Sequence, residues 1–215
     1  ARTRGIVTLT MEPARLSEFM IAQALKERFH LSDCVVIPDG ATGSALVDRL
    51  GQAGARVLER LIRPGDTLGI GWGRTMISLA RSVSARRMPA LSVVQMTGGM
   101  TAPIGFTPEL CVSQLATALG ARAINITAPA IVSSVEVRDI LMGESALRSQ
   151  FDTARGADKI IFGICSTRPG SSLYETGLIP EGDLAEQTLR NAVAVVAGRF
   201  IDNRGAPAKG PLDAR

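Results

Sequence analysis

Short apolar segments that alternate with amphipathic helical patterns are the feature that most restricts how this chain of 215 residues folds. In the middle of the chain, a strand is predicted at Thr67–Ile70, a helix from Arg74 to about Ser84, and a second strand at Leu91–Met96. Because each helix returns the chain to the end of the sheet where the previous strand began, successive strands run parallel. Right-handed crossovers then leave few topologies, so we predict an α/β, Rossmann-like fold whose mostly parallel sheet has helices on both faces.

The same alternation covers most of the chain and predicts a single domain over residues 1–215. The other predicted elements are helices over Leu16–Phe29, Leu46–Leu61, Glu109–Gly120 and Ser145–Arg155, strands over Cys34–Ile37, Arg122–Ile126 and Lys159–Cys165, and a helix from Asp183 into the run Val193–Ala197. No repeat or linker divides the chain before residue 200. The tail Asn203–Pro211 has no apolar periodicity, so we expect a loop or flexible end there, with further chain after it.

Composition restricts the classes of protein to which the chain can belong. Aromatic residues make up only 4% of the chain, which favours the aliphatic core of a parallel sheet. The formal net charge of +4 comes without a basic run, so charge alone does not predict nucleic-acid binding. Cys34, Cys111 and Cys165 lie far apart, which argues against a disulfide framework or a CxxC metal site and favours a reducing compartment. Without an apolar stretch of membrane-spanning length or a signal peptide, we expect a soluble cytoplasmic protein with no membrane partner.

The segment Gly69–Thr75 leads from a predicted buried strand into a helix. Gly71 and Gly73 let the backbone turn with its N–H groups converging, while Arg74 adds a guanidinium and Thr75 a hydroxyl. These groups suit a phosphate or a cluster of hydroxyls, although a tight strand-to-helix turn also explains the glycines. The segment has neither the Gly-Lys-Ser/Thr ending of a P-loop nor the third glycine of a dinucleotide fingerprint, so no nucleotide or other cofactor is predicted.

Two further strand ends carry polar groups toward the same edge of the sheet. Gly98 and Gly99 follow one strand, where they predict either ligand-facing N–H groups or a plain turn, and Gln114 lies on the next helix. The last site, Gly163–Ser172, has the hydroxyls and guanidinium by which sugars are bound, but its residues alone favour an ordinary polar loop with a serine helix cap. The candidate residues in that loop are Ser166, Arg168, Ser171 and Ser172.

Catalytic groups are sparse, so we predict that the chain is not an enzyme. The only histidine, His30, stands at a predicted helix end, where a capping or surface role is expected. Asp39 and Asp66 have the setting of turn residues. Cys165 is the best candidate nucleophile, yet a buried and inert thiol explains it better. No metal ligands are predicted.

Several of these motifs, taken in order, give the chain its family resemblance. They are Ala24–Phe29 with Val35–Pro38, Gly69–Thr75, Gly98-Gly99, Ala128-Pro129-Ala130, Gly163–Leu178 and Gly198–Asp202. Over about residues 5–205 the sequence resembles the sugar-binding domain of SorC/DeoR-type bacterial transcription regulators. The resemblance implies a phosphosugar-isomerase-like α/β fold that has lost catalysis and binds a sugar or sugar phosphate as an effector. It also implies a homo-oligomer, dimer or tetramer, whose affinity for operator DNA changes when the effector binds.

Carried over by position, the resemblance assigns Gly71, Gly73, Arg74 and Thr75 to a phosphate loop. It surrounds the sugar with Gly98, Gly99, Gln114 and the Ser166–Ser172 loop. Three departures stand out. The family's N-terminal helix-turn-helix is not in this chain, and neither is its closing segment with a Gly-Gly turn and a lysine. Val195 stands where family members often carry an acidic residue. An active phosphosugar isomerase, or an oligomerisation module with a vestigial pocket, remains an alternative.

Overall fold

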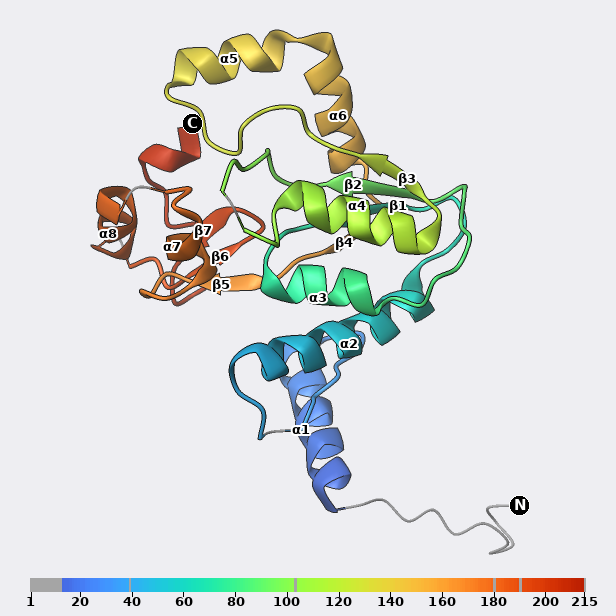
Figure 1. The fold of residues 1–215 in the computed structure, drawn as a ribbon. Helices are drawn as coiled ribbons and strands as arrows, with labels where there is room; N and C mark the ends of the chain where they lie inside the picture. Colours follow the sequence, from blue (N-terminus) through green and yellow to red (C-terminus); the bar gives the residue numbers. More distant parts are fainter. Residues whose placement is uncertain (1–12, 39, 103, 180, 190, 215) are drawn as a thin grey trace, which may run out of the picture.

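The structure is a computed structural model that describes residues 13–38, 40–102, 104–179, 181–189 and 191–214 (Figure 1). The elements, in chain order, are α1 Pro13–Phe29, α2 Gly43–Leu61, β1 Thr67–Ile70, α3 Arg74–Ser82, β2 Ser92–Gln95, α4 Pro108–Leu119, β3 Arg122–Ile124, α5 Val135–Gly143, α6 Ser145–Arg155, β4 Lys159–Ile161, β5 Ile164–Ser166, α7 Ser172–Thr176, α8 Glu181–Leu189, β6 Ala194–Val196, β7 Arg199–Ile201 and the 3₁₀ helix η2 Pro211–Ala214.

Four strands form the parallel sheet that the alternation predicts, in the order β3-β2-β1-β4. Leu68 of β1 lies between Val93 of β2 and Lys159 of β4 in the register. The first three strands are added in one direction and β4 joins on the other side of β1, so the strand order reverses between β1 and β4. In open α/β sheets, ligands bind beyond the carboxyl ends of the strands at such a reversal.

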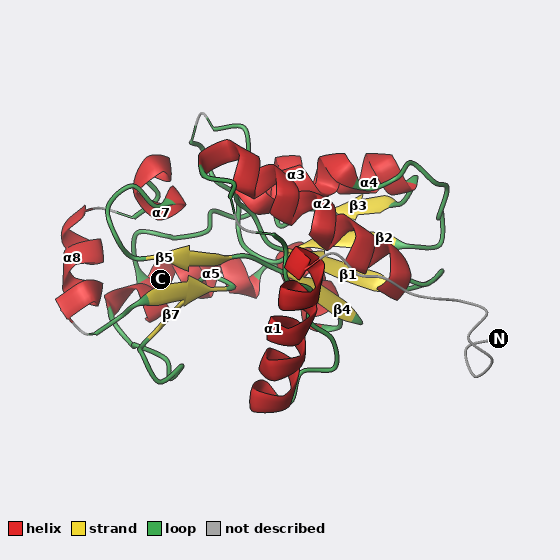
Figure 2. Ribbon diagram, turned by 90° about the horizontal axis from the view of Figure 1, so that it is seen from below, coloured by secondary structure: helices red, strands yellow, loops and turns green. Residues whose placement is uncertain are grey.

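Helices cover both faces of this sheet, as predicted. Leu68 and Val93 point into the main core, which they share with buried side chains of α2, α3 and α4. Figure 2 shows α3 and α4 side by side over that face. The neighbouring residue Val94 points to the opposite face because side chains alternate along a strand, and there α6 packs against β2. The α/β class with a mostly parallel sheet is therefore confirmed.

Local chemistry fixes where α4 begins and ends. The Thr107 hydroxyl accepts a hydrogen bond from the backbone N–H of Leu110 at 3.4 Å, and Pro108 occupies the first helical turn, where its missing N–H costs nothing. Gly120 ends the helix with φ 53°, a left-handed conformation that glycine adopts without strain. The Thr107 cap thus joins α4 to the loop that leads from the end of β2.

A small antiparallel sheet, in the order β5-β6-β7, follows the parallel one and was not predicted. The sequence predicted one strand over Lys159–Cys165, but the segment is divided at Phe162-Gly163 into β4 and β5. The predicted continuation of a helix through Val193–Ala197 is wrong, because Ala194–Val196 forms β6. The β-branched valines there suit a strand, and the turn Ala197-Gly198 pairs β6 with β7. Leu173, Val195 and Phe200 form part of a second core under this sheet.

The predicted strand at Cys34–Ile37 is also wrong. The segment has no regular secondary structure, and it pairs with no strand in the described part of the chain. It follows α1, which projects away from the sheet in Figure 1, so no strand lies beside it to share backbone hydrogen bonds. Val35 is accordingly 51% exposed. Asp39, predicted as a turn residue, lies outside the described residues.

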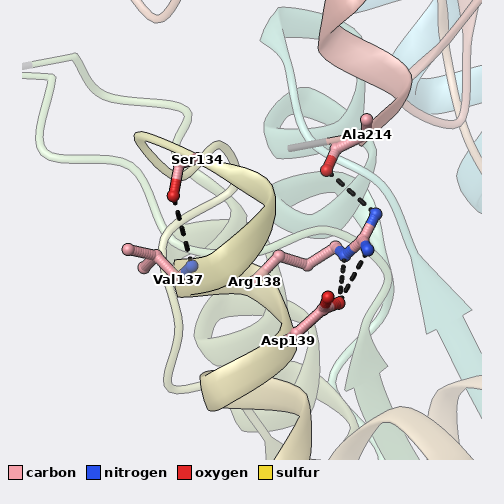
Figure 3. A network of polar contacts seen from close by, with 5 residues as sticks. All are labelled: Ser134, Val137, Arg138, Asp139 and Ala214. Atoms are coloured by element: carbon pink, nitrogen blue, oxygen red, sulfur yellow. Dashed lines mark hydrogen bonds and ion pairs between the residues drawn. The ribbon is translucent and has the colours of Figure 1, made fainter.

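The predicted loop at Asn203–Pro211 is confirmed, but it is packed against the domain rather than a flexible end. Its Ala208 N–H donates to the Phe200 carbonyl at 2.9 Å. The helix η2 then ends beside α5, where the Arg138 guanidinium donates to the Ala214 carbonyl at 2.9 Å and also pairs with Asp139 (Figure 3). These contacts hold the chain close to the small sheet up to Ala214.

Candidate functional site

A cavity of about 360 Å³ opens where the strand order reverses. We call it the first cavity. One wall is the turn from β1 into α3, and the other is the turn that follows β5. Among the sequence-predicted site residues, those that line it are Gly73, Arg74, Thr75, Ser166, Arg168, Ser171 and Ser172. The fold thus brings together two segments that lie about ninety residues apart in the sequence.

The β1–α3 wall presents the start of a helix. Gly73 precedes α3 with φ 120°, which L side chains rarely adopt, and it supplies no side chain to cap the helix. Its own N–H donates to the Phe106 carbonyl at 3.3 Å, which joins this turn to the loop before α4. A helix start without a side-chain cap leaves N–H groups and a partial positive charge for an anion or a hydroxyl.

The opposite wall is a tight turn followed by the five-residue helix α7. The Arg168 N–H donates to the Ser166 hydroxyl at 3.1 Å, and the Ser171 N–H donates to the Arg168 carbonyl at 3.2 Å. These bonds fix the turn, and its residues Ser166, Arg168 and Ser171 line the cavity. The Oγ atom of Ser171 is buried and has no hydrogen-bond partner, so it has a donor and acceptor capacity that a ligand would satisfy.

Charges from two elements meet at the edge of this cavity, where Arg74 belongs to the lining and Glu175 lies just outside it. Arg74 Nη1 lies 3.3 Å from Glu175 Oε1, with the two side chains 47% and 41% exposed. This ion pair joins the first turn of α3 to α7. Cys165, also on the lining, is half-buried, and burial raises the pKa of its thiol against the opposing effect of Arg74. The thiol is therefore protonated at neutral pH, which makes it a poor nucleophile.

A second cavity of about 250 Å³ lies on the other side of Trp72, and its lining is mostly apolar. The two cavities share Trp72, Gly163 and Cys165. Two predicted site residues, Gly71 and Gly98, line the second cavity rather than the first. Trp72 also contacts both hydrophobic cores, so the only tryptophan of the chain stands between the two cavities and the two cores.

The strand-end loop at Gly98-Gly99 is held by backbone pairing. The Gly99 N–H donates to the Ala128 carbonyl at 2.7 Å, and the Gly99 carbonyl accepts from the Ala130 N–H at 3.0 Å. A Cβ atom on Gly98 would collide with the backbone of Pro129, which explains the glycine there. Gly99 lines neither cavity, and its N–H and carbonyl are both used in this pairing.

Gln114 lies exposed on α4 and lines neither cavity. His30 is exposed at the end of α1, with φ 54°.

Sequence reasoning did not single out Trp72 or Glu175. Glu175 stands three residues after Ser172, a spacing typical of a capping box, and that signal could have drawn attention to it. In the structure Glu175 pairs with Arg74 instead.

In the described part of the chain, no three His, Cys, Asp or Glu side chains gather as a metal site would require. None of the described helices is both long and apolar enough to cross a membrane.

Residues 16–215 match the Sugar-bind family, described as a sugar-binding domain. The chain is 28% identical to the uncharacterized transcriptional regulator YjhU of Escherichia coli K12, over 100% of this chain and 67% of that protein. It is 27% identical to the erythritol catabolism regulatory protein EryD of Brucella abortus, over 94% of this chain and 64% of that protein. The chain thus spans about two thirds of the length of these curated relatives.

The crystal structure of the full-length sorbitol operon regulator SorC from Klebsiella pneumoniae has the same fold, with a TM-score of 0.85 at 23% identity. The match covers 100% of this chain and 70% of SorC. The fold likeness and the family match over 200 residues agree with the motifs seen in the sequence. The chain belongs to the Sugar-bind family of sugar-binding domains.

Proposed function

We propose that this chain is the effector-binding domain of a sugar-responsive transcription regulator and that it performs no catalysis. In this proposal it binds a sugar or sugar phosphate in the cytoplasm. Binding changes the assembly of a homo-oligomer, dimer or tetramer, and thereby the affinity for operator DNA of a domain outside this chain. The family match supports the sugar, and relatives named as transcriptional regulators support the regulatory role.

One observation carries the proposal: the first cavity lies at the reversal of strand order and is lined by hydroxyls, guanidinium groups and an uncapped helix start. Sugar hydroxyls both donate and accept hydrogen bonds, so serine and threonine hydroxyls suit them. A phosphate suits helix N–H groups and guanidinium groups. A volume of about 360 Å³ lies within the range of small-molecule sites.

The second cavity offers a route by which binding could reach the rest of the molecule. Trp72 lines both cavities, and the second is also lined by Thr97 and Gly98 of the loop between β2 and α4. In this proposal the ligand orders that loop against Trp72. An effect on assembly further requires that the ligand bind one quaternary state more tightly than the other.

A ligand screen tests the proposal. We would measure the melting temperature and the fluorescence of Trp72 with pentose, hexose and polyol phosphates and with their unphosphorylated parents. A ligand that binds only the folded state raises the melting temperature, and one that occupies either cavity changes the environment of Trp72. We expect at least one sugar or sugar phosphate to change both signals, and silence across the panel would contradict the proposal.

Two variants test whether the ligand binds in the first cavity. Thr75→Val removes a hydroxyl of the first cavity at nearly constant volume, and Thr153→Val makes the same change on α6, away from both linings. We expect Thr75→Val to lower the affinity for the best ligand of the screen and Thr153→Val to leave that affinity unchanged. A search by NMR for conversion of each bound sugar phosphate separates a sensor from an isomerase, because any product would identify an enzyme.

A further inference from the structure

The two arginines of the first cavity differ in whether a carboxylate already pairs with them. Arg74 of α3 pairs with Glu175 of α7 at 3.3 Å. Arg168 lies in the opposite turn, and among the described residues its guanidinium has no ion-pair partner; only its backbone N–H is used, in the bond to Ser166. We call the Arg168 side of the cavity the cationic side. On the other side, which we call the neutral side, Glu175 offsets the side-chain charge of Arg74 from just outside the lining, and only the partial positive charge of the α3 start remains.

The cationic side has a second free group. Ser171 belongs to the same turn as Arg168, since its N–H donates to the Arg168 carbonyl. Its Oγ atom is buried without a partner, although Ser171 precedes α7 in the position where a serine usually caps the helix. A hydroxyl and a guanidinium on one short turn are the donors that a phosphate monoester needs.

The neutral side suits sugar hydroxyls rather than a second phosphate. The Glu175 carboxylate accepts hydrogen bonds and the Arg74 guanidinium donates them, so a pair of hydroxyls could bind to both. A second phosphate at Arg74 would have to displace Glu175 or lie beside its negative charge. Like charges placed together at a binding site weaken binding and exclude wrong ligands.

We propose that Glu175 is a specificity-determining residue that restricts the effector to a single phosphate group. That phosphate binds at the Arg168–Ser171 turn, and the sugar hydroxyls bind at the Arg74–Glu175 pair. This inference rests on the proposed function, because it assigns the phosphate end of the same effector to the first cavity and the hydroxyl end to the Arg74–Glu175 pair at its edge. It adds a selection rule, for sugar monophosphates over sugar bisphosphates, that the cavity lining alone does not give.

The test compares matched ligands on the whole chain by Trp72 fluorescence titration. The probes are fructose, fructose 6-phosphate and fructose 1,6-bisphosphate, together with glucose, glucose 6-phosphate and glucose 1,6-bisphosphate. For the better hexose, we expect the monophosphate to bind at least about tenfold more tightly than the bisphosphate, as the repulsion of a partly exposed carboxylate would give. High salt should reduce the ratio, because it screens that repulsion.

Variants then test whether Glu175 causes the preference for the monophosphate over the bisphosphate. Glu175→Gln keeps the shape of the side chain and removes the charge, so the ratio should fall to about threefold or less, whereas Glu175→Asp should preserve most of it. Arg168→Gln should weaken the monophosphate about tenfold and leave the unphosphorylated parent unchanged. Glu144→Gln removes an exposed carboxylate between α5 and α6 and serves as the control. Neither glutamate belongs to a cavity lining, but only Glu175 pairs with a lining residue, Arg74. Melting temperatures of all variants verify folding.

The outcomes separate this inference from the proposed function. A bisphosphate that binds the wild-type chain as tightly as the monophosphate would overturn the role of Glu175 and leave a sugar sensor in place. If Glu175→Gln still binds the monophosphate more tightly than the bisphosphate by the wild-type ratio, the role of Glu175 is likewise overturned and the sugar sensor stands. If only unphosphorylated sugars bind, the phosphate assignment is wrong but sugar binding stands. If no sugar or sugar phosphate of the wider screen binds, both proposals fall.

Discussion

The Asp66 carboxylate and the Lys159 ammonium lie 2.8 Å apart and join the start of β1 to the start of β4, 93 residues further along the chain. The same Oδ2 atom of Asp66 accepts the Arg63 N–H at 2.7 Å and so closes the turn before β1. The Asp66 side chain is only 13% exposed. This contact therefore ties together the two strands between which the sheet order reverses, at the end of the sheet opposite to the candidate site.

We expect Asp66→Asn to lower the free energy of unfolding at pH 7 by about 1.5–3 kcal/mol, the usual contribution of a hydrogen bond to a charged group. The bond to Lys159 is the largest cause that lowers the pKa of Asp66 below its ordinary value of 3.8. A lowered folded-state pKa gives stability that is present above pH 3.8 and is lost as the pH falls through the folded pKa.

Urea unfolding at pH 7 and again near pH 2 measures this difference, which should shrink toward zero at the lower pH. Asp152→Asn is the matched control, because Asp152 pairs with Arg155 on the exposed surface of α6, and it should cost less than about 0.5 kcal/mol. Equal losses for the two variants at pH 7 would contradict the role given to Asp66.

Ala197 is strained at the tip of the β6–β7 hairpin. It has φ 48° and is followed by Gly198 with φ 79°, so both turn residues adopt the conformations for which Asn-Gly is preferred. Ala197→Gly should raise the free energy of unfolding by about 0.5–1 kcal/mol, because it relieves the left-handed strain of alanine.

The same change at Ala146, an exposed residue of α6, should lower that free energy by about 1 kcal/mol, since glycine weakens a helix. Urea denaturation of the two variants gives opposite signs if the assignment is correct. A loss of stability in Ala197→Gly would show that the hairpin tip is not strained.

The parallel part of the fold was predictable because its signals are local. The helix predicted over Ser145–Arg155 has those bounds in the structure, and β1 has the predicted bounds Thr67–Ile70. The two wrong secondary-structure predictions share one cause. Cys34–Ile37 has strand-forming residues, but among the described residues no strand pairs with it. Val193–Ala197 continues an apolar run that could be helical until Ala194–Val196 pairs with β5 and β7. Pairing of distant segments overrides local preference.

The candidate site was predictable as strand ends, but its division into two cavities was not. Polar residues after β1 and β5 meet because the order of the strands reverses there, and the sequence shows where each strand ends without showing the order. Gly98 faces the second cavity rather than the first. Glu175 pairs with a residue 101 positions away, for which no local pattern exists.

Thiol reactivity should separate the three cysteines. Burial raises the pKa of Cys111 to about 12, so about 10⁻⁴ of it is thiolate at pH 8, and it should react with a disulfide reagent only after unfolding. Burial also raises the pKa of Cys165, which should react slowly, while the half-buried Cys34 should react first. Mass spectrometry of the labelled peptides identifies each site, and rapid labelling of Cys111 in the native chain would contradict its place in the core.

Gly98 provides the sharpest test of the strand-end loop. A Cβ atom there would lie 2.6 Å from the Cα atom of Ala130, and backbone cannot move aside as the end of a flexible side chain does. Gly98→Ala should therefore shift the loop away from Ala130, cost about 1–3 kcal/mol of stability and weaken any ligand that changes Trp72 fluorescence. Gly105→Ala, in the same loop with nothing within 4 Å of the added atom, should change neither property. Because the two variants add the same methyl group to one loop, equal behaviour would mean that the pairing of Gly99 with Ala128 and Ala130 does not position the site.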